Sequence, residues 1–174
     1  MYPKAYIDYL IHFHCDRDYF ECHEVLEEHW KEDTKQDRKP HWVALIQVAV
    51  SLYHHRRENF PGALRMMKSA ISIIREQSYE LEKLGLNIVE LHSILQKEYT
   101  AIQNKVPYKS FNLPINDKKL LEICKSKCSN EGKTWGMSSD MSDEQLVHKH
   151  SLRDRSDVIA ERKRQIALKQ NRFK

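Results

Sequence analysis

Chain breakers are scarce in this sequence, which has only 4 glycines and 5 prolines among its 174 residues. A collagen-like chain and a glycine- and serine-rich linker chain are therefore excluded. An all-β sandwich is disfavoured as well, because its many tight turns need Gly, Pro and Asn. The sequence also lacks a run of about 18 consecutive apolar residues, so we expect no membrane-spanning segment. The length suits one domain with an appendage.

Cysteine is infrequent too, and the four cysteines are Cys15, Cys22, Cys124 and Cys128. The first residues lack the charged start and apolar core of a signal peptide, so we expect a cytoplasmic protein with reduced thiols. Cys124 and Cys128, with His148 and His150 further on, are a candidate zinc set. Their spacing is not that of a zinc finger, so incidental cysteines are the preferred interpretation.

Helical periodicity dominates residues 1–105. The apolar side chains of residues 63–74, for example, recur at spacings of one and three positions and so share one helical face. Capping residues mark helix starts at Asp18, Asn59 and Asn87. We expect helices at residues 2–14, 18–32, 40–57, 59–85 and 87–105, a short helix at 116–127 and a long one from 142 onward.

Helices of this length with short connections predict an all-α fold, a small antiparallel helical bundle with a C-terminal helical extension. The composition divides the chain into a bundle domain at 1–115, a short helix with a mobile linker at 116–141, and a basic C-terminal helix at 142–174. The linker is placed at 129–141 because that stretch is rich in Ser, Gly and Asp and has no periodicity.

The helix predicted over residues 18–32 carries polar residues where apolar ones are expected. At about 100° per residue, its aromatic and aliphatic side chains form one inward arc. His23 and Glu27 lie in the middle of that arc, one turn apart, and Glu24 and Glu28 lie on its edge. A buried carboxylate needs a partner, because leaving it unpaired costs several kcal/mol.

The next helix offers partners for these residues. Its second apolar face carries Gln47 and His54, so His23, Glu27, Gln47 and His54 converge if that face meets the preceding helix. The preferred interpretation is a hydrogen-bond network that fixes how the helices pack, because His-x-x-x-Glu spacing is common by chance. The alternatives are a divalent metal bound by His23, Glu27 and His54, and a general base and acid in a pocket. No other cofactor is indicated.

Three motifs occur in a fixed order. They are Tyr19-Phe-Glu-Cys-His-Glu-Val-Leu-Glu-Glu-His-Trp30, Leu45-Ile-Gln-Val-Ala-Val-Ser-Leu-Tyr-His54 and Asn59-Phe-Pro-Gly-Ala63. In this order they resemble the bacterial and archaeal domain-of-unknown-function 309 family over about residues 6–80. The resemblance implies a small all-helical bundle with a left-handed twist, and it implies no activity. The family's signature positions in this sequence are His23, Glu24, Glu27, Trp30, Gln47 and His54.

Residues 152–174 form a basic tail. They contain eight Lys or Arg and three Asp or Glu, a net charge of +5, which leaves −1 for the rest of the chain. Apolar residues recur every seven positions, but the second apolar position of a coiled-coil heptad is missing. The simplest interpretation of the tail is a helix that is solvated or packed on its own domain. The alternatives are a helix that binds a protein partner, a salt-sensitive contact for nucleic acid, and a helix that lies on a membrane surface. Its candidate partner-binding residues are Leu152, Ile159, Arg162, Arg164 and Ile166.

The favoured function is a non-enzymatic cytoplasmic interaction module that binds a protein partner through its C-terminal helix. The sequence supports it through the separate tail and through the absence of a glycine-rich phosphate loop or a nucleophile motif. One alternative is a metal-dependent or general-base enzyme that uses His23, Glu27 and His54. Another is a nucleic-acid accessory protein that uses the basic tail. The sequence leaves the oligomeric state open.

Overall fold

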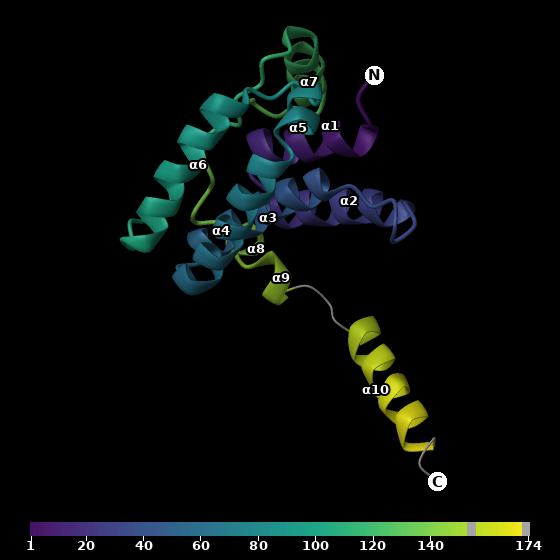
Figure 1. The fold of residues 1–174 in the computed structure, drawn as a ribbon. Coiled ribbons are helices and arrows are strands. Elements are labelled where there is room, and N and C mark those ends of the chain that lie inside the picture. Colours follow the sequence, from purple (N-terminus) through teal and green to yellow (C-terminus); the bar gives the residue numbers. More distant parts are fainter. Residues whose placement is uncertain (153–155, 172–174) are drawn as a thin grey trace.

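The computed structural model describes residues 1–152 and 156–171, with side chains for 1–152 and 161–171, and these residues form helices and no strand. The predicted all-α class is therefore confirmed. The elements follow one another along the chain (Figure 1) as α1 (Lys4–Ile11), η1 (His12–Asp16, a π-helix), α2 (Tyr19–Glu32), α3 (Pro40–Arg56), α4 (Phe60–Glu76), α5 (Ser78–Lys83), α6 (Ile88–Gln103), α7 (Lys118–Asn130), α8 (Glu144–Val147), α9 (Lys149–Leu152) and α10 (Ser156–Asn171).

Local side-chain caps start three helices where the sequence predicts them. Asp18 Oδ1 accepts the backbone N–H of Glu21 at 3.1 Å and so caps α2. Asn59 Oδ1 accepts the backbone N–H of Gly62 at 3.2 Å at the start of α4, and Asn87 caps α6 in the same way. These oxygens satisfy backbone donors that have no partner within their own helix.

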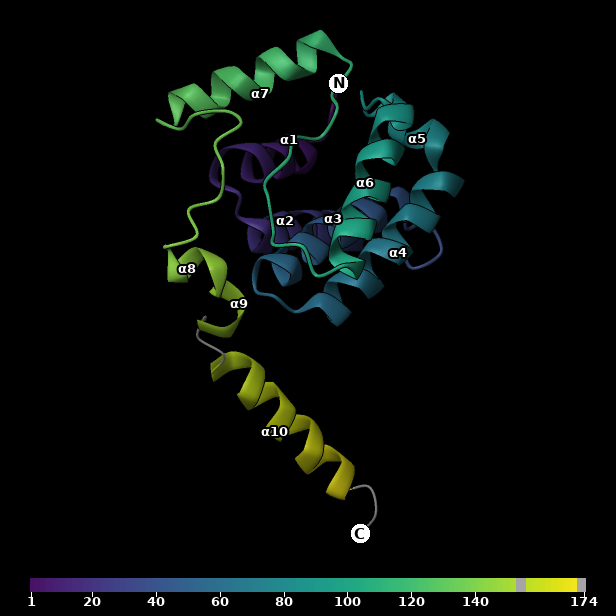
Figure 2. The same cartoon turned by 90° about the vertical axis from the view of Figure 1, so that its left-hand side faces the viewer.

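Helix α3 lies at the centre of the helical body, a name used here for residues 1–130. It packs most extensively on α4 and then on α2, while α4 also packs on α6, and α1 packs on α2 and α7. Figures 1 and 2 both place α3 between α2 and α4. Buried side chains lie around most of α3, including Trp42, Leu45 and Leu52, as expected for a helix with two apolar faces. The antiparallel order and the left-handed twist stay predictions.

Two predicted helices differ in the structure. The helix predicted over residues 59–85 is divided at Gln77 into α4 and α5, where the Ser78 hydroxyl donates to carbonyls of the preceding turn. The first helix continues into η1 and ends at Arg17, whose φ of 53° is left-handed. Gly85 follows α5 with a φ of 80°, a conformation that costs glycine little because it has no Cβ.

The expectation of reduced thiols is wrong for one pair of cysteines. Cys15 and Cys128 form a disulfide, with 6.7 Å between their Cα atoms, because α1 and η1 lie beside α7. Their sequence separation of 113 residues gives no hint of this pairing. Cys22 and Cys124 are free and buried. With Cys128 in a disulfide, the candidate zinc set of Cys124, Cys128 and two histidines loses a thiolate.

The segment 129–141, for which the sequence predicts a mobile linker, begins in the last residues of α7, and the residues after α7 contact the helical body at several points. Trp135 stacks on the ring of His14, with 4.2 Å between ring centroids. Arg17 Nε donates to the Met137 carbonyl at 2.7 Å. With these contacts, the segment runs along the helical body from α7 to α8 (Figure 2). The division of the chain into three domains stays a prediction.

The long C-terminal helix predicted from residue 142 is three helices among the described residues. Asp143, rather than Ser142, caps α8 by accepting the N–H of Leu146 at 3.2 Å. Helices α8 and α9 are short and lie near the helical body, whereas α10 projects away from it (Figures 1 and 2). In the described part of the chain, no helix is both long enough and apolar enough to cross a membrane.

Candidate functional site

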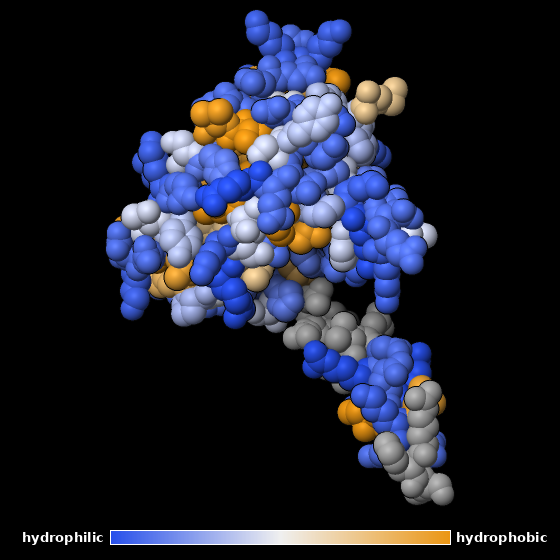
Figure 3. Space-filling view, viewed as in Figure 1, coloured by the Kyte–Doolittle hydropathy of each residue, from blue (hydrophilic) through white to orange (hydrophobic). Residues whose placement is uncertain are grey.

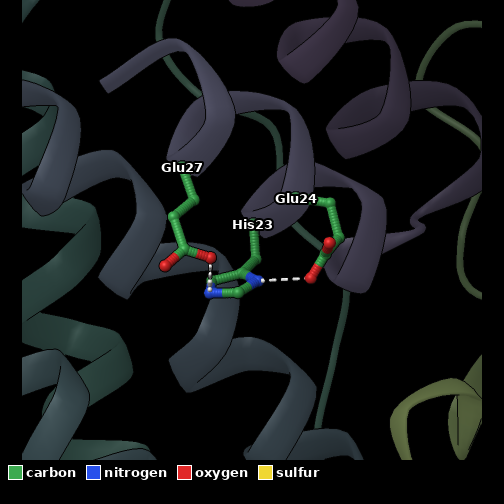
Figure 4. A group of neighbouring side chains, drawn as sticks. All are labelled: His23, Glu24 and Glu27. Carbon is green, nitrogen blue, oxygen red and sulfur yellow. Dashed lines mark hydrogen bonds and ion pairs between the residues drawn. The ribbon is translucent and has the colours of Figure 1, made fainter. Parts of the chain in front are cut away.

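The centre of the predicted polar cluster is His23, which lies between two carboxylates of its own helix (Figure 4). Its Nδ1 lies 3.1 Å from Glu24 Oε1, and its Nε2 lies 3.2 Å from Glu27 Oε2. Glu27 in turn accepts a salt bridge from Lys31 Nζ at 2.8 Å. These groups are half-buried and share one face of α2, because residues three and four apart are neighbours on a helix.

The electrostatics of this cluster favour charged side chains. The hydrogen bond from Lys31 lowers the pKa of the Glu27 carboxyl, burial opposes this shift, and the charges of His23 and Lys31 lower the pKa further. With a carboxylate at each ring nitrogen, a protonated His23 donates two hydrogen bonds. The described contacts therefore balance these charges within α2 itself.

The same three residues are also the ones that can hold a metal ion. One nitrogen of His23 and one oxygen each from Glu24 and Glu27 lie within 4.8 Å of one another. Imidazole and carboxylate ligands suit a divalent metal, provided that His23 gives up one proton and one of its two hydrogen bonds. The sequence predicted His54 as a ligand, whereas the close group contains Glu24 in its place.

The remaining predicted residues lie outside this cluster. Trp30 stacks under the guanidinium of Arg38, which lies 4.5 Å from the ring centroid. Gln47 Oε1 is buried and has no hydrogen-bond partner among the described residues. His54 Nδ1 lies 3.1 Å from Asn59 Nδ2. The described contacts of these three side chains do not join them to the His23 cluster in one hydrogen-bonded network.

His23 and His54 do share one cleft, of about 200 Å³, between α2, α3 and α9. Phe20 and Tyr53 supply aromatic walls, and His150 comes from α9. The backbone N–H of His150 donates to Tyr53 Oη at 3.1 Å, and its ring meets Phe20 edge to face at 5.6 Å. The sequence suggested His150 only for the candidate zinc set and not for this cleft, because no local pattern connects it to residues about a hundred positions earlier.

Two buried arginines lie behind the cleft. Arg17 and Arg56 are 2% and 3% exposed, and the oxygens that accept their hydrogen bonds are all neutral. Arg56 Nε has no partner in the part of the chain that the structure describes. The Arg56 guanidinium lies 4.7 Å from the ring centroid of Tyr19, which lines the cleft. Buried cations are costly without a counter-charge. Arg57, the neighbour of Arg56 in the chain, lines the cleft itself and brings a positive charge to it.

His55 is a buried histidine that the sequence analysis did not single out. It is 1% exposed, and its Nδ1 lies 2.7 Å from Glu98 Oε1 on α6. Its Nε2 lies 2.7 Å from the Val106 carbonyl. Burial lowers the pKa of His55, but the hydrogen bonds and the charge of Glu98 outweigh it, so that the pKa is raised. This pair ties α3 to α6.

The fold and the site together define a small all-helical protein with a histidine and two glutamates on one helix beside an aromatic cleft. The chain belongs to the DUF309 family, whose model, described as a domain of unknown function, matches residues 6–66. It is 52% identical over 166 residues to the uncharacterized protein YpuF of Bacillus subtilis (strain 168), an alignment that covers 95% of each chain. No solved structure matches this chain. The predicted family is thereby confirmed, and the function of the family remains unknown.

Proposed function

We propose that this protein is a non-enzymatic interaction module in which α10 binds a protein partner. One observation carries the proposal: every described side chain of α10, residues 161–171, is exposed to solvent. Ile166 and Leu168 are 55% and 53% exposed, although both are apolar. Figure 3 shows the coloured part of α10 as small apolar areas within a hydrophilic surface, away from the helical body.

A partner is the natural source of stability for such a helix. Helices of about 16 residues without tertiary contacts are marginal in water, and most helical stability in proteins comes from packing of an apolar face. The described side chains include the basic run Arg162, Lys163 and Arg164 beside Ile166. A surface that complements α10 is therefore an apolar groove with an acidic rim, the helix-in-groove mode of recognition. The predicted contact residue Ile159 lies in α10, but its side chain lies outside those described.

The test is proximity cross-linking in cells followed by binding of the purified partner to the purified full-length chain. We expect Ile166→Asp to remove binding, because it places a charge in the apolar contact. The matched control is Val89→Asp, at an apolar position of α6 that is 83% exposed. On binding, the α10 amides should gain protection from hydrogen exchange. A partner that binds equally well without residues 153–174 would show the proposal to be wrong.

The same experiment separates protein from nucleic acid. If the captured partner is nucleic acid, binding should fall steeply with salt and should be lost in Arg162→Glu/Arg164→Glu but not in Ile166→Asp. That outcome would replace the protein-partner proposal with the nucleic-acid alternative. The cytoplasmic location expected from the sequence is part of the proposal and is checked by cell fractionation.

A metal site is the second candidate function, favoured by the close grouping of His23, Glu24 and Glu27. It is tested by titrating Zn²⁺ and Mn²⁺ into the full-length chain prepared without a histidine tag. We expect stoichiometric binding that Glu27→Gln abolishes. The matched control is Glu32→Gln, because Glu32 Oε2 lies 3.2 Å from His29 Nδ1 on the same helix. A lack of stoichiometric metal, or an equal loss in both variants, would leave His23 in a packing role.

A further inference from the structure

The cleft between α2, α3 and α9 has an unsatisfied positive end. Arg57 lines it, and its Nε donates to His148 Nδ1 at 3.1 Å. No carboxylate pairs with Arg57 among the residues that the structure describes. The buried Arg56 next to it likewise has only neutral acceptors. Asp18 and Glu21, which flank the cleft residues Tyr19 and Phe20 in the chain, are held by Lys149.

His54 adds a neutral hydrogen-bond donor at the same end. Asn59 Oδ1 accepts the N–H of Gly62, so the amide nitrogen of Asn59 faces His54 Nδ1. The Nδ1 atom must then accept, which places the proton of the neutral ring on Nε2. Burial lowers the pKa of His54, and the charges of Arg57 and Arg65 lower it further, so the ring is neutral near pH 7.

The rest of the cleft is aromatic and does not attract a second anion. Phe20 and Tyr53 form its walls, and the Arg57 guanidinium lies 5.3 Å from the centroid of the Tyr53 ring. His23, which also lines the cleft, already has a carboxylate at each ring nitrogen. A matching ligand therefore has one planar negative group at one end and an uncharged flat ring at the other. Its size is bounded by the volume of about 200 Å³.

We infer that this cleft binds a small aromatic carboxylate, with the carboxylate on Arg57 and His54 and the ring between Phe20 and Tyr53. A guanidinium presents paired N–H donors that match a carboxylate, and aromatic walls suit a ring with few polar atoms. Among the described residues, α9 is the last element along the chain that lines the cleft, and the described part of α10 does not line it. Binding of this ligand goes beyond the interaction function and does not depend on it.

Three probes of related shape test this inference on the full-length protein, with a chelator present to exclude metal. Benzoate carries both the ring and the charge, benzamide has the ring without the charge, and acetate has the charge without the ring. In a two-dimensional NMR titration we expect saturable millimolar binding of benzoate that shifts the resonances of Phe20, Tyr53 and Arg57. Benzamide and acetate should each bind at least about tenfold more weakly.

Two variants show whether Arg57 is the anion-binding group. Arg57→Met should weaken benzoate binding by about tenfold or more, while Arg57→Lys should retain part of the affinity. The matched control is Arg65→Met, which removes a cation from the same local field but does not line the cleft. If benzamide binds as well as benzoate, if benzoate does not saturate, or if Arg65→Met causes the same loss as Arg57→Met, the inference is wrong.

Discussion

Helices α4 and α10 are almost equal in length, with 17 and 16 residues, but they differ in the burial of their apolar side chains. The apolar residues of α4 are buried against α3 and α6, and Met67 and Ile74 are completely inaccessible. Ile166 and Leu168 of α10 remain more than half exposed. The difference lies in the width of the apolar stripe, because α4 repeats its apolar residues every three to four positions and α10 mainly every seven.

The two helices also differ in the side-chain interactions that stabilise their helical conformation. Asn59 caps α4 within a packed environment. The described part of α10 relies on its own surface pairs, such as Arg164 with Glu161 at 2.9 Å, both exposed. Exposed pairs of this kind contribute little to stability. The comparison therefore predicts that changes in α4 alter the stability of the whole protein and that changes in α10 alter only binding.

The largest expected effect comes from removing the same side chain in each helix. Ile74→Ala should lower the free energy of unfolding by about 2–5 kcal/mol, because it leaves a cavity in the core. Ile166→Ala should change it by less than about 0.5 kcal/mol, because the side chain is exposed. Urea denaturation followed by circular dichroism measures both. Equal losses in the two variants would mean that α10 packs on the helical body.

A buried charge pair provides the next test of the contrast. Glu98→Gln removes the charge opposite His55 and should cost about 1–3 kcal/mol at mildly acidic pH. Because the folded-state pKa of His55 is raised, its stabilising contribution is complete below the unfolded pKa of about 6.5 and is lost as pH rises through the folded value. The difference between the parent protein and Glu98→Gln should therefore shrink in alkaline solution.

The matched change in α10 is Glu161→Gln, which removes the exposed pair with Arg164. It should alter the free energy of unfolding by less than about 0.5 kcal/mol at every pH. Thermal unfolding of both variants across a pH series is the measurement. A loss for Glu98→Gln that does not depend on pH would contradict the assignment of a protonated His55.

Within the helical body, the smallest expected effect is at the helix cap of α4. Asn59→Ala should cost about 1 kcal/mol, because a backbone donor of the first turn loses its acceptor. The change also removes the amide that faces His54 Nδ1, so the NMR titration of His54 should shift in the same variant. If the free energy of unfolding is unchanged while the pKa of His54 shifts, the Asn59 amide acts mainly on His54 in the cleft and contributes little to capping α4.

Much of the fold was predictable because helix starts and apolar faces are local properties. Asp18, Asn59 and Asn87 act as caps as expected, and α3 is the central helix that its two apolar faces predict. The break at Gln77 and the π-helical end of the first helix were not predicted. Both depend on competing hydrogen bonds and packing, and helical periodicity does not report them.

The candidate site was predictable only in part, because local spacing along a helix is visible in the sequence and the packing between helices is not. Spacing along α2 placed His23 and Glu27 together, because residues four apart are neighbours on any helix. It did not identify Glu24 as the third close ligand, since that depends on the rotamers of adjacent side chains. It also gave no sign that Arg56, at the end of α3, is buried in the structure.

By itself, the sequence determined the helical class, the starts of the main helices and the membership of the family. Each of these depends on residues that are close together in the chain or on motifs of fixed spacing. The tertiary structure alone decided that Cys15 meets Cys128, that His150 closes a cleft beside Tyr53, and that α10 lies apart from the helical body. These outcomes follow from which helix faces pack together, and packing joins residues that no local pattern connects.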